Sequence, residues 1–412
     1  MENQLDLTCV AFKKDSYLTI EGKQNTGCFY IIKEGRVMVT KEAPVEGEKY
    51  EMLGVGDFIG VISTMSFQNH VETAVALSDV VVIKVLQSQY IALIQKNPAV
   101  TNKIIKQFSN RLRFLNDNLA ELTMKNIAQE GPAHLFNVAE YYFAQKQYQH
   151  AFYAFVKYYK YCPNGDKIAE AKKRIMQLSS HAEKITEHSP DEMNRIYRKN
   201  TMIFAEGEPG NELFIIQRGA VKISKVVDKN EVLLAVLKPG DIFGEMALLE
   251  DKPRIASAIA YEDCKLMAVH KNNFELMIKS QPQLIAKITS LLADRIWLIY
   301  KKLDNALMED PMGRLYNTMY LQMEKNRIRL DGTGPQTYSF DFGWAELFGM
   351  TGLSAEHNKP LHFKISNNSK IQIQENRINI LSIMEIVRQN EYYRKMDKRD
   401  KQKSNEQRAG SN

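Results

Sequence analysis

"FGEMALLEDKPRIASA", residues 243–258, places a glycine and a glutamate at one end and an arginine followed by small and apolar residues at the other. Gly244 lets the backbone approach a ligand closely, and the free N–H groups that follow it predict an anion-binding helix start. Arg254 can donate two charge-assisted hydrogen bonds to a pair of phosphate oxygens. The ionised carboxylate of Glu245 only accepts hydrogen bonds, so it suits a sugar hydroxyl beside the anion.

A cyclic nucleotide has this layout, with a phosphate and a ribose hydroxyl side by side. The alternative is a surface helix with an acidic first turn and a solvated arginine. The context favours the ligand site, because apolar runs at 202–204, 213–216 and 221–223 are split by the turn signals EGEPGN and QRG. Another run, at 232–237, enters the motif through a Pro-Gly-Asp turn. Closely spaced short strands predict a small antiparallel barrel or jelly roll.

Residues 201–304 resemble the cyclic-nucleotide-binding domain of bacterial catabolite-activator regulators and of the regulatory subunits of cyclic-AMP-dependent kinase. FGEMALLEDKPRIAS is similar to the phosphate-binding cassette of that family, and EGEPGNELFII with RGAV is similar to its preceding strands and glycine turns. The resemblance implies that the ligand is held by the cassette and by an arginine of the helix that follows. These residues are Gly244, Glu245, Met246, Ala247, Arg254, Ile255, Ala256, Ser257 and Arg295.

The amphipathic stretch 283–307 predicts one long helix, which in the resembled family closes the pocket and forms the dimer seam. Arg295, Trp297 or Tyr300 can approach the base by hydrogen bonding or stacking, and core or dimer packing is the alternative role for each. The resemblance therefore implies a homodimer. Selective cyclic GMP sites of that family often carry a threonine directly after the cassette arginine. Ile255 stands there in this chain, so cyclic AMP is the expected regulatory ligand.

An internal repeat places a second copy of this domain at the N-terminus. EGKQNTGCFYIIKEGRVMVTK at 21–41 mirrors 206–225, and both Asp57 and Gly60 lie 184 residues before their counterparts. Val61 replaces the glutamate and His70 replaces the arginine of the second copy. Valine cannot accept a hydroxyl, and histidine offers at best one charged donor. We expect this copy to be structural or dimer-forming, with another anion in its pocket as the alternative.

The linker between the copies, residues 132–165, has apolar and aromatic residues at helical spacing. It resembles one tetratricopeptide repeat, with the pattern positions Leu135, Val138, Ala139, Tyr142, Ala151, Phe155 and Pro163. A lone repeat rarely stands without stacking neighbours, which favours a spacer or intersubunit packing. A groove for a partner peptide is the alternative, kept open by the density of tyrosines. A third, charged helix is expected to follow, over 165–185.

The segment DPMGRLYNTMYLQM, from residue 310, resembles the start of a winged helix-turn-helix, with 349–351 as the turn. Gly352 and Leu353 stand where the family carries a base-reading arginine, and Pro360 is expected to kink or end the recognition helix. Residues 309–385 contain eight Lys/Arg and nine Asp/Glu, which is not the basic footprint of a DNA reader. The sequence therefore predicts that the fold is retained and that base readout is lost.

Composition sets the broad class. The chain has 412 residues, 44% hydrophobic and 25% charged, which is ordinary for a globular protein of several domains. No signal-peptide pattern or membrane-length apolar run is present, so a cytoplasmic location is expected. The four cysteines are far apart and predict neither disulfides nor a metal site. No nucleophile and base, metal-ligand spacing or cofactor motif indicates an enzyme.

We therefore predict an α+β multidomain protein with two β jelly-roll cyclic-nucleotide-binding-like barrels, an α-helical tetratricopeptide-like linker and a C-terminal winged-helix-like module. The predicted domains are 1–125, 126–186, 187–308, 309–387 and a disordered basic tail at 388–412, where eight Lys/Arg face four Asp/Glu.

Two functional hypotheses follow. In the first, the chain is a cyclic-AMP-responsive transcription regulator. In the second, it responds to a cyclic nucleotide and acts on other proteins through its linker and C-terminal module, without reading DNA. Any DNA contact by the basic tail is expected to be weak and salt-sensitive.

Overall fold

The computed structural model describes residues 6–41, 51–123, 131–180, 185–227, 230–244, 253–353, 355–374 and 377–409. The chain divides into two compact units. The first comprises residues 1–39, 52–114 and 126–296, and the second comprises 40–51, 115–125 and 297–412. No helix in the described part of the chain combines the length and hydrophobicity that a membrane crossing needs.

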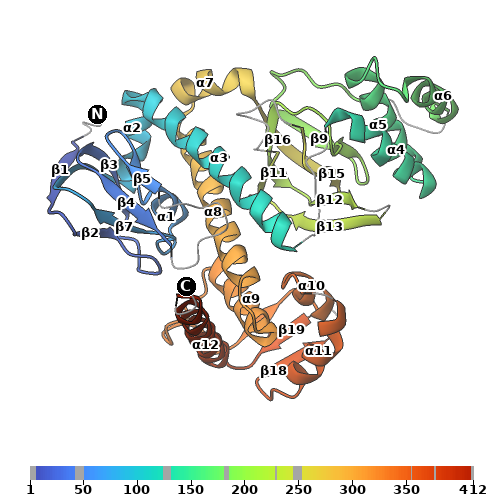
Figure 1. Cartoon of the computed structure of the whole chain (residues 1–412). Helices are drawn as coiled ribbons and strands as arrows, with labels where there is room; N and C mark the ends of the chain where they lie inside the picture. Colours follow the sequence, from blue (N-terminus) through green and yellow to red (C-terminus); the bar gives the residue numbers. More distant parts are fainter. Residues whose placement is uncertain are drawn as a thin grey trace. The chain divides into compact units, whose positions relative to one another are not determined.

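The N-terminal barrel consists of two four-stranded sheets (Figure 1), with strand orders β1-β8-β3-β6 and β2-β7-β4-β5. The strands are β1 Thr8–Phe12, β2 Tyr17–Thr19, β3 Cys28–Glu34, β4 Val37–Thr40, β5 Glu51–Leu53, β6 Phe58–Ile59, β7 Thr73–Ala76 and β8 Val80–Leu86. Alternating positions of these strands, among them Ile32, Val37, Val39, Ala74 and Val82, point inward and form the core between the sheets.

The second barrel repeats this topology strand for strand, with orders β9-β16-β11-β14 and β10-β15-β12-β13. The strands are β9 Asn194–Tyr197, β10 Met202–Phe204, β11 Glu212–Arg218, β12 Val221–Val227, β13 Asn230–Leu237, β14 Ile242–Phe243, β15 Ser257–Ala260 and β16 Cys264–His270. Strands β11, β14, β15 and β16 each begin and end 184 residues after their counterparts β3, β6, β7 and β8. The predicted internal repeat and the predicted barrels are confirmed.

Each barrel is followed by a short helix and then by a long one. The first pair is α2 Tyr90–Lys96 and α3 Pro98–Thr123, and the second is α7 Lys271–Ser280 and α8 Pro282–Ala306. Both long helices begin on a proline, whose fixed φ suits the first turn, where its missing N–H has no partner to lose. Within the first unit, the hydroxyl of Tyr90 lies 3.1 Å from that of Thr289 on α8, and burial raises the pKa of Tyr90 to about 12.

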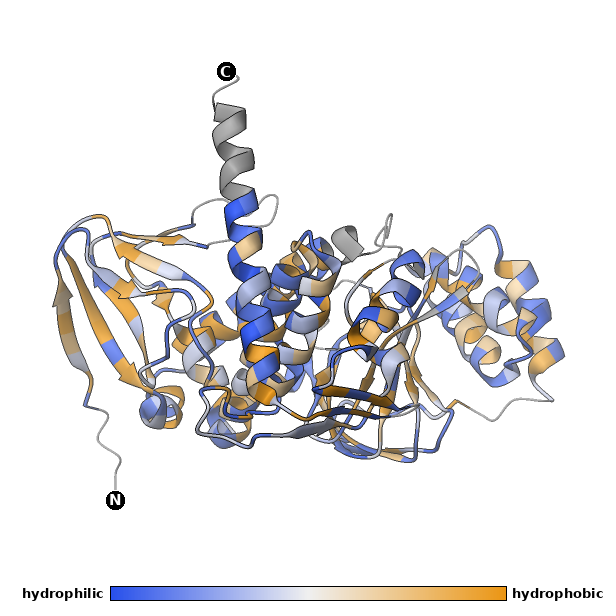
Figure 2. Cartoon of the chain, turned by 90° about the horizontal axis from the view of Figure 1, so that it is seen from below, coloured by the Kyte–Doolittle hydropathy of each residue, from blue (hydrophilic) through white to orange (hydrophobic). Residues whose placement is uncertain are grey.

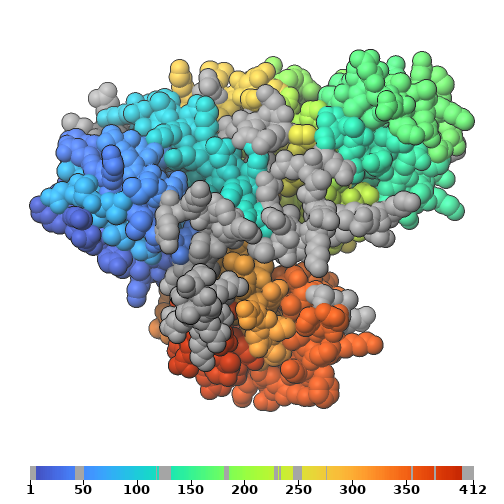
Figure 3. Space-filling model, viewed as in Figure 1, coloured from blue at the N-terminus to red at the C-terminus, as the bar shows by residue number. Residues whose placement is uncertain are grey.

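Three helices, α4 Leu135–Ala144, α5 Tyr148–Tyr161 and α6 Ile168–Leu178, form what we call the helical module. Tyr142, Phe155 and Tyr158 are core residues, buried together with the small Ala139 and Ala151, whereas Tyr148 and Tyr159 are exposed. The same cluster includes side chains of the second barrel, namely Met202, Ala205 and Ile259. Figure 3 shows the atoms of the module packed against those of the barrel. The module and the second barrel therefore share one apolar core.

The second unit contains a three-stranded antiparallel sheet of order β17-β19-β18 with helices around it. Its elements are α9 Pro311–Lys325, β17 Tyr338–Phe340, α10 Trp344–Gly349, α11 Asn358–Ser366, β18 Ile371–Gln374, β19 Arg377–Ile380 and α12 Ile383–Ala409. Asp310 caps α9 by accepting from the backbone N–H groups of Met312 (2.7 Å) and Gly313 (3.0 Å), a contact worth about 1 kcal/mol. Residues 350–352 form a turn after α10, one position later than the predicted 349–351.

Two expectations for this unit were wrong. Pro360 neither kinks nor ends α11, because the helix starts at Asn358 and the proline falls in the first turn, where its N–H is not needed. Residues 388–409 are not a disordered tail but continue α12. Figure 2 shows that the coloured part of this helix is mostly hydrophilic, with strongly apolar residues near its start. Those residues join the core of the unit, and Tyr393 stacks on Tyr316 of α9, which anchors a sequence rich in helix-forming Lys, Arg, Glu and Gln.

Candidate functional site

The candidate site begins at the end of β14, where a tight turn delivers Gly244. In this turn, the carboxylate of Asp241 accepts from the N–H of Lys238 (2.9 Å), and the N–H of Gly240 donates to Ile216 O (2.8 Å). Gly244 has a φ of 72°, in the left-handed region that favours glycine. A Cβ added to it would lie 2.6 Å from Nη1 of Arg254 and 3.1 Å from the carbonyl oxygen of Glu212. The left-handed φ of this residue and the neighbouring arginine both favour glycine here.

Arg254 lies inside the barrel and is 7% exposed. Its Nη1 donates to Gly244 O at 2.8 Å, and its guanidinium carbon is 4.1 Å from the centroid of the Phe204 ring. Phe214 and Phe243 complete an aromatic wall around Phe204. A cation over an aromatic face gains about 0.5–2 kcal/mol, and a buried guanidinium presents its donors in a fixed planar fork. The arrangement holds a positive charge beside a closely approachable backbone, which suits a phosphate.

The remaining cassette residues fall into two groups. Glu245, Met246 and Ala247 lie outside the described residues, so their predicted contacts stay predictions. After Arg254 the chain is described again: Ile255 is half-buried, and Ala256 and Ser257 are buried. Ser257 Oγ accepts a hydrogen bond from the backbone N–H of Glu206 at 2.9 Å. This hydroxyl therefore joins the cassette to the loop before β11.

The long helix α8 reaches the same region through Arg295. Its Nη1 donates to the carbonyl oxygen of Ile242 at 3.1 Å, two residues before Gly244. Trp297 and Tyr300, the other two residues considered for the base, belong to the second unit and are buried. The Tyr300 ring carries the ammonium group of Lys41 3.0 Å from its centroid. Of the three candidates, Arg295 is the one whose contact with the cassette strand is described.

Comparison of the sequence with known proteins points to the same kind of site. A family model for the cyclic nucleotide-binding domain matches residues 9–97 and 194–281. The cyclic AMP receptor protein of Thermus thermophilus is 30% identical over 163 residues, which is 39% of this chain and 71% of that protein. This chain belongs to the CRP-like family of cyclic-nucleotide-binding-domain proteins.

Another similar protein and a similar solved structure are also transcriptional regulators by their descriptions. A CRP-like cAMP-activated global transcriptional regulator of Mycobacterium tuberculosis is 29% identical over 155 residues, 37% of this chain and 68% of that protein. The crystal structure of a transcriptional regulator of the CRP/FNR family from Thermus thermophilus aligns with 48% of this chain and 98% of its own, at 18% identity and a TM-score of 0.37.

The first cyclic-nucleotide-binding domain has a glycine with the same left-handed φ, but different side chains at the key positions. Gly60 has a φ of 76° and precedes α1 Val61–Ser66, on which Val61 and Met65 are buried. His70 occupies the place of Arg254, is 7% exposed, and its Nδ1 has no hydrogen-bond partner among the described residues. Burial lowers the pKa of His70, and the nearby carboxylate of Glu72 opposes this shift only in part. The imidazole is therefore neutral near pH 7 and cannot replace a guanidinium.

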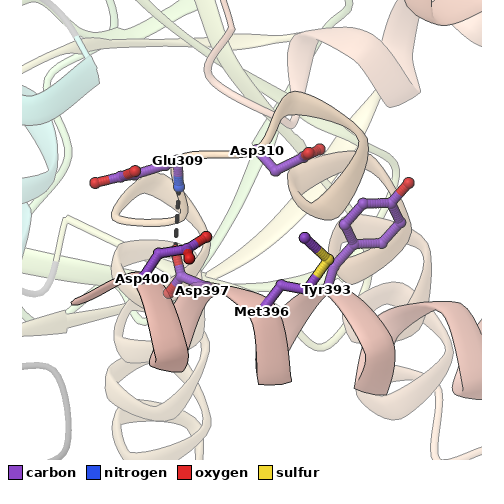
Figure 4. Close-up of a pocket in the computed structure, with 6 residues that line it drawn as sticks. All are labelled: Glu309, Asp310, Tyr393, Met396, Asp397 and Asp400. Atoms are coloured by element: carbon purple, nitrogen blue, oxygen red, sulfur yellow. Dashed lines mark hydrogen bonds between the residues drawn. The ribbon is translucent and has the colours of Figure 1, made fainter. Parts of the chain in front are cut away.

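A cavity in the second unit has the wrong charge for a nucleotide. It lies between the start of α9 and α12, and Figure 4 shows its lining side chains: Glu309, Asp310, Tyr393, Met396, Asp397 and Asp400. The backbone N–H of Glu309 donates to Asp397 Oδ1 at 3.2 Å. Four carboxylates around one space repel a phosphate. Among the described residues, no group of His, Cys, Asp or Glu side chains is arranged to hold a metal ion.

Sequence reasoning missed the contacts of the loop EGEPGN, which it interpreted only as a turn. Glu206 and Glu208 of this loop are 2% and 6% exposed. The Glu206 carboxylate lies near His134, just before the helical module, and Lys225 of β12, and the Glu208 carboxylate contacts Lys157 and Tyr153 of α5. Two acidic residues in a glycine turn are normally solvated, so the signal available was weak. The signal was the spacing of Tyr153 and Lys157, which lie one helical turn apart and place two polar groups on the same side of an otherwise apolar helix.

Proposed function

We propose that the second domain binds a cyclic nucleotide, with cyclic AMP preferred, as a regulatory ligand. The observation that carries the proposal is the buried Arg254 guanidinium, held against Gly244 at 2.8 Å in a domain of the matching family. Arg254 binds the phosphate in this proposal, Glu245 accepts from the ribose, and Arg295 lies at the base side. The first domain carries valine and a neutral histidine at the two key positions and does not bind the nucleotide. The chain is not an enzyme and requires no cofactor.

The output passes through α8, which runs as one helix from the first unit into the second. We propose that the second unit is a winged-helix-like module and that the protein regulates transcription. Support comes from the sequence α10, turn, α11 followed by the β18–β19 hairpin, and from relatives described as transcriptional regulators. In this proposal two chains associate, since paired modules read paired half-sites.

The exposed face of α11 supports a second function, the control of another protein. The helix carries no arginine, and Gly352 and Leu353 precede it where base-reading side chains belong. Phe363 is 70% exposed on this helix, between the buried Leu361 and Ile365. Exposed aromatic residues are typical of protein interfaces rather than of DNA-reading helices.

The helical module serves in either case as a tetratricopeptide-like spacer. Ala139 and Ala151 of its first two helices are fully buried, and Tyr142, Phe155 and Tyr158 belong to a core cluster that the module shares with the second barrel. This packing favours the spacer over a groove for a partner peptide.

Calorimetric titration with cyclic AMP tests the ligand proposal. We expect one site per chain, and we expect Arg254→Ala to weaken binding by about 2–4 kcal/mol because a charged two-pronged partner is lost. His70→Ala is the matched control in the first domain and should leave the affinity unchanged. Two equivalent sites per chain, or an unchanged affinity of Arg254→Ala, would contradict the proposal. Selection from random DNA duplexes with the ligand-bound protein then separates the two outputs.

A further inference from the structure

The loop that carries Glu208 is held from two sides. On one side, the Glu208 carboxylate receives Lys157 Nζ at 2.7 Å and the Tyr153 hydroxyl at 3.0 Å, both from α5 of the helical module. The backbone N–H of Ala205 donates to the same carboxylate at 3.1 Å. A buried carboxylate with three donors is stable in place, and removing a donor leaves charge without compensation. The module therefore determines where this side chain sits.

On the other side, the backbone of the loop is bonded to the backbone of Arg254. The N–H of Arg254 donates to Glu208 O at 2.8 Å, and the N–H of Gly207 donates to Arg254 O at 2.8 Å. These two bonds fix the Cα from which the guanidinium projects. Glu208 thus contacts the helical module with its carboxylate and the candidate ligand arginine with its carbonyl.

Close packing makes this connection stiff. Gly207 has a φ of 82°, and a Cβ on it would lie 3.0 Å from the carbonyl oxygen of Gly131 and 3.6 Å from Cβ of His134, just before the module. The Glu206 carboxylate lies 3.4 Å from Nε2 of His134 and accepts from the N–H of Val226 at 3.0 Å. Because the loop 206–208 is packed on both sides, a displacement of the helical module also displaces the loop.

We propose that the helical module sets the affinity of the second domain for its ligand, with Tyr153, Lys157 and Glu208 as positioning residues for Arg254. The inference rests on the proposed nucleotide site and adds a regulatory input to it. A partner or modification that shifts α5 releases the Glu208 carboxylate, displaces the backbone of Arg254 and weakens binding. Because coupling between two sites is reciprocal, bound nucleotide must in turn stabilise the docked module.

The test measures the dissociation constant of cyclic AMP by calorimetry on full-length variants. Tyr153→Phe and Lys157→Met each remove one donor to Glu208, and we expect each to weaken binding about fivefold and the double variant about tenfold or more. Lys157→Arg keeps a charged donor and should restore most of the affinity. Lys160→Met is the matched control. It removes the same charge from the same helix, but Lys160 pairs with the exposed Glu187, at 3.1 Å, and not with Glu208. It should bind as the wild type does.

A second readout tests the reciprocal effect. Hydrogen exchange of the amides of α5 should slow on addition of cyclic AMP in the wild type and in Lys160→Met, and should not change in Arg254→Ala. Wild-type affinity, within twofold, in both Tyr153→Phe and Lys157→Met would overturn the inference, as would equal losses in Lys157→Met and Lys160→Met. If the double variant fails to fold, the single variants decide. Absence of binding by the wild type would instead refute the proposed function, so the two failures are distinguishable.

Discussion

Replacing Gly244 with alanine is the sharpest perturbation of the candidate site. Two costs follow from the structure. A non-glycine residue with a φ of 72° costs about 1–2 kcal/mol of stability. The new Cβ would also lie 2.6 Å from Arg254 Nη1, so the guanidinium must move, since the other close neighbour, Glu212 O at 3.1 Å, is backbone. If the displaced arginine loses its charged hydrogen bonds to the phosphate, affinity falls by about 2–3 kcal/mol, roughly 30- to 150-fold.

The first domain supplies a control for the backbone cost alone. Gly60 has a φ of 76°, but a Cβ there would lie 3.5 Å from the nearest atom of His70, which is ordinary contact. Gly60→Ala should therefore lower the thermal stability by a similar backbone term and leave the affinity for cyclic AMP unchanged. The assay is thermal unfolding with calorimetric titration on both variants. Wild-type affinity in Gly244→Ala would refute the assignment of Arg254 as the phosphate ligand, whatever happens to stability.

Three further predictions concern pH, base preference and DNA. Because burial lowers the pKa of His70 in the folded chain, the unfolded chain binds more protons below about pH 6.5, and the free energy of unfolding should decrease as the pH is lowered through that range. Denaturant titrations at several pH values should show a weaker pH dependence for His70→Gln than for the wild type, and an equal dependence would count against this prediction. Cyclic AMP should outcompete cyclic GMP because Ile255 offers no hydroxyl, and a tenfold preference for cyclic GMP would contradict this. Selection from random duplexes by the chain cut after Asp400, which keeps the packed part of α12, should return no consensus, and a reproducible palindrome would establish a working DNA reader.

Local sequence patterns and the internal repeat were sufficient to predict most of the fold. Short apolar runs separated by glycine turns predicted the strands of the second barrel, and the 184-residue offset predicted the first. The 3.6-residue period at 283–307 predicted α8 to within one residue at each end. These features are set by neighbours in sequence or by self-similarity, which a single chain displays. The sequence pattern also selected Gly244 and Arg254 as site residues, but their direct contact, with Arg254 Nη1 donating to Gly244 O, was not predicted.

Features that depend on distant partners were not predicted. Glu208 and Lys157 are 51 positions apart, and nothing local indicates that their charges are buried together. The extension of α12 beyond residue 388 depends on Tyr393 finding Tyr316 across the unit, whereas its polar composition alone indicated disorder. Pro360 was expected to kink or end its helix, because the sequence did not show that the helix starts at Asn358, which puts the proline in the first turn.

The histidine in the first domain has a consequence for the shape of the dose–response curve. A Hill coefficient can rise only to the number of responsive sites, so a tandem receptor with two working pockets could act as a steep switch within one molecule. Under the proposed function the first domain, with a neutral imidazole at His70, does not respond, and occupancy of a single chain then follows a simple hyperbola, graded over a wide range of messenger concentration. On that proposal, any steeper response arises between chains or from a second input, and not from the duplicated barrel.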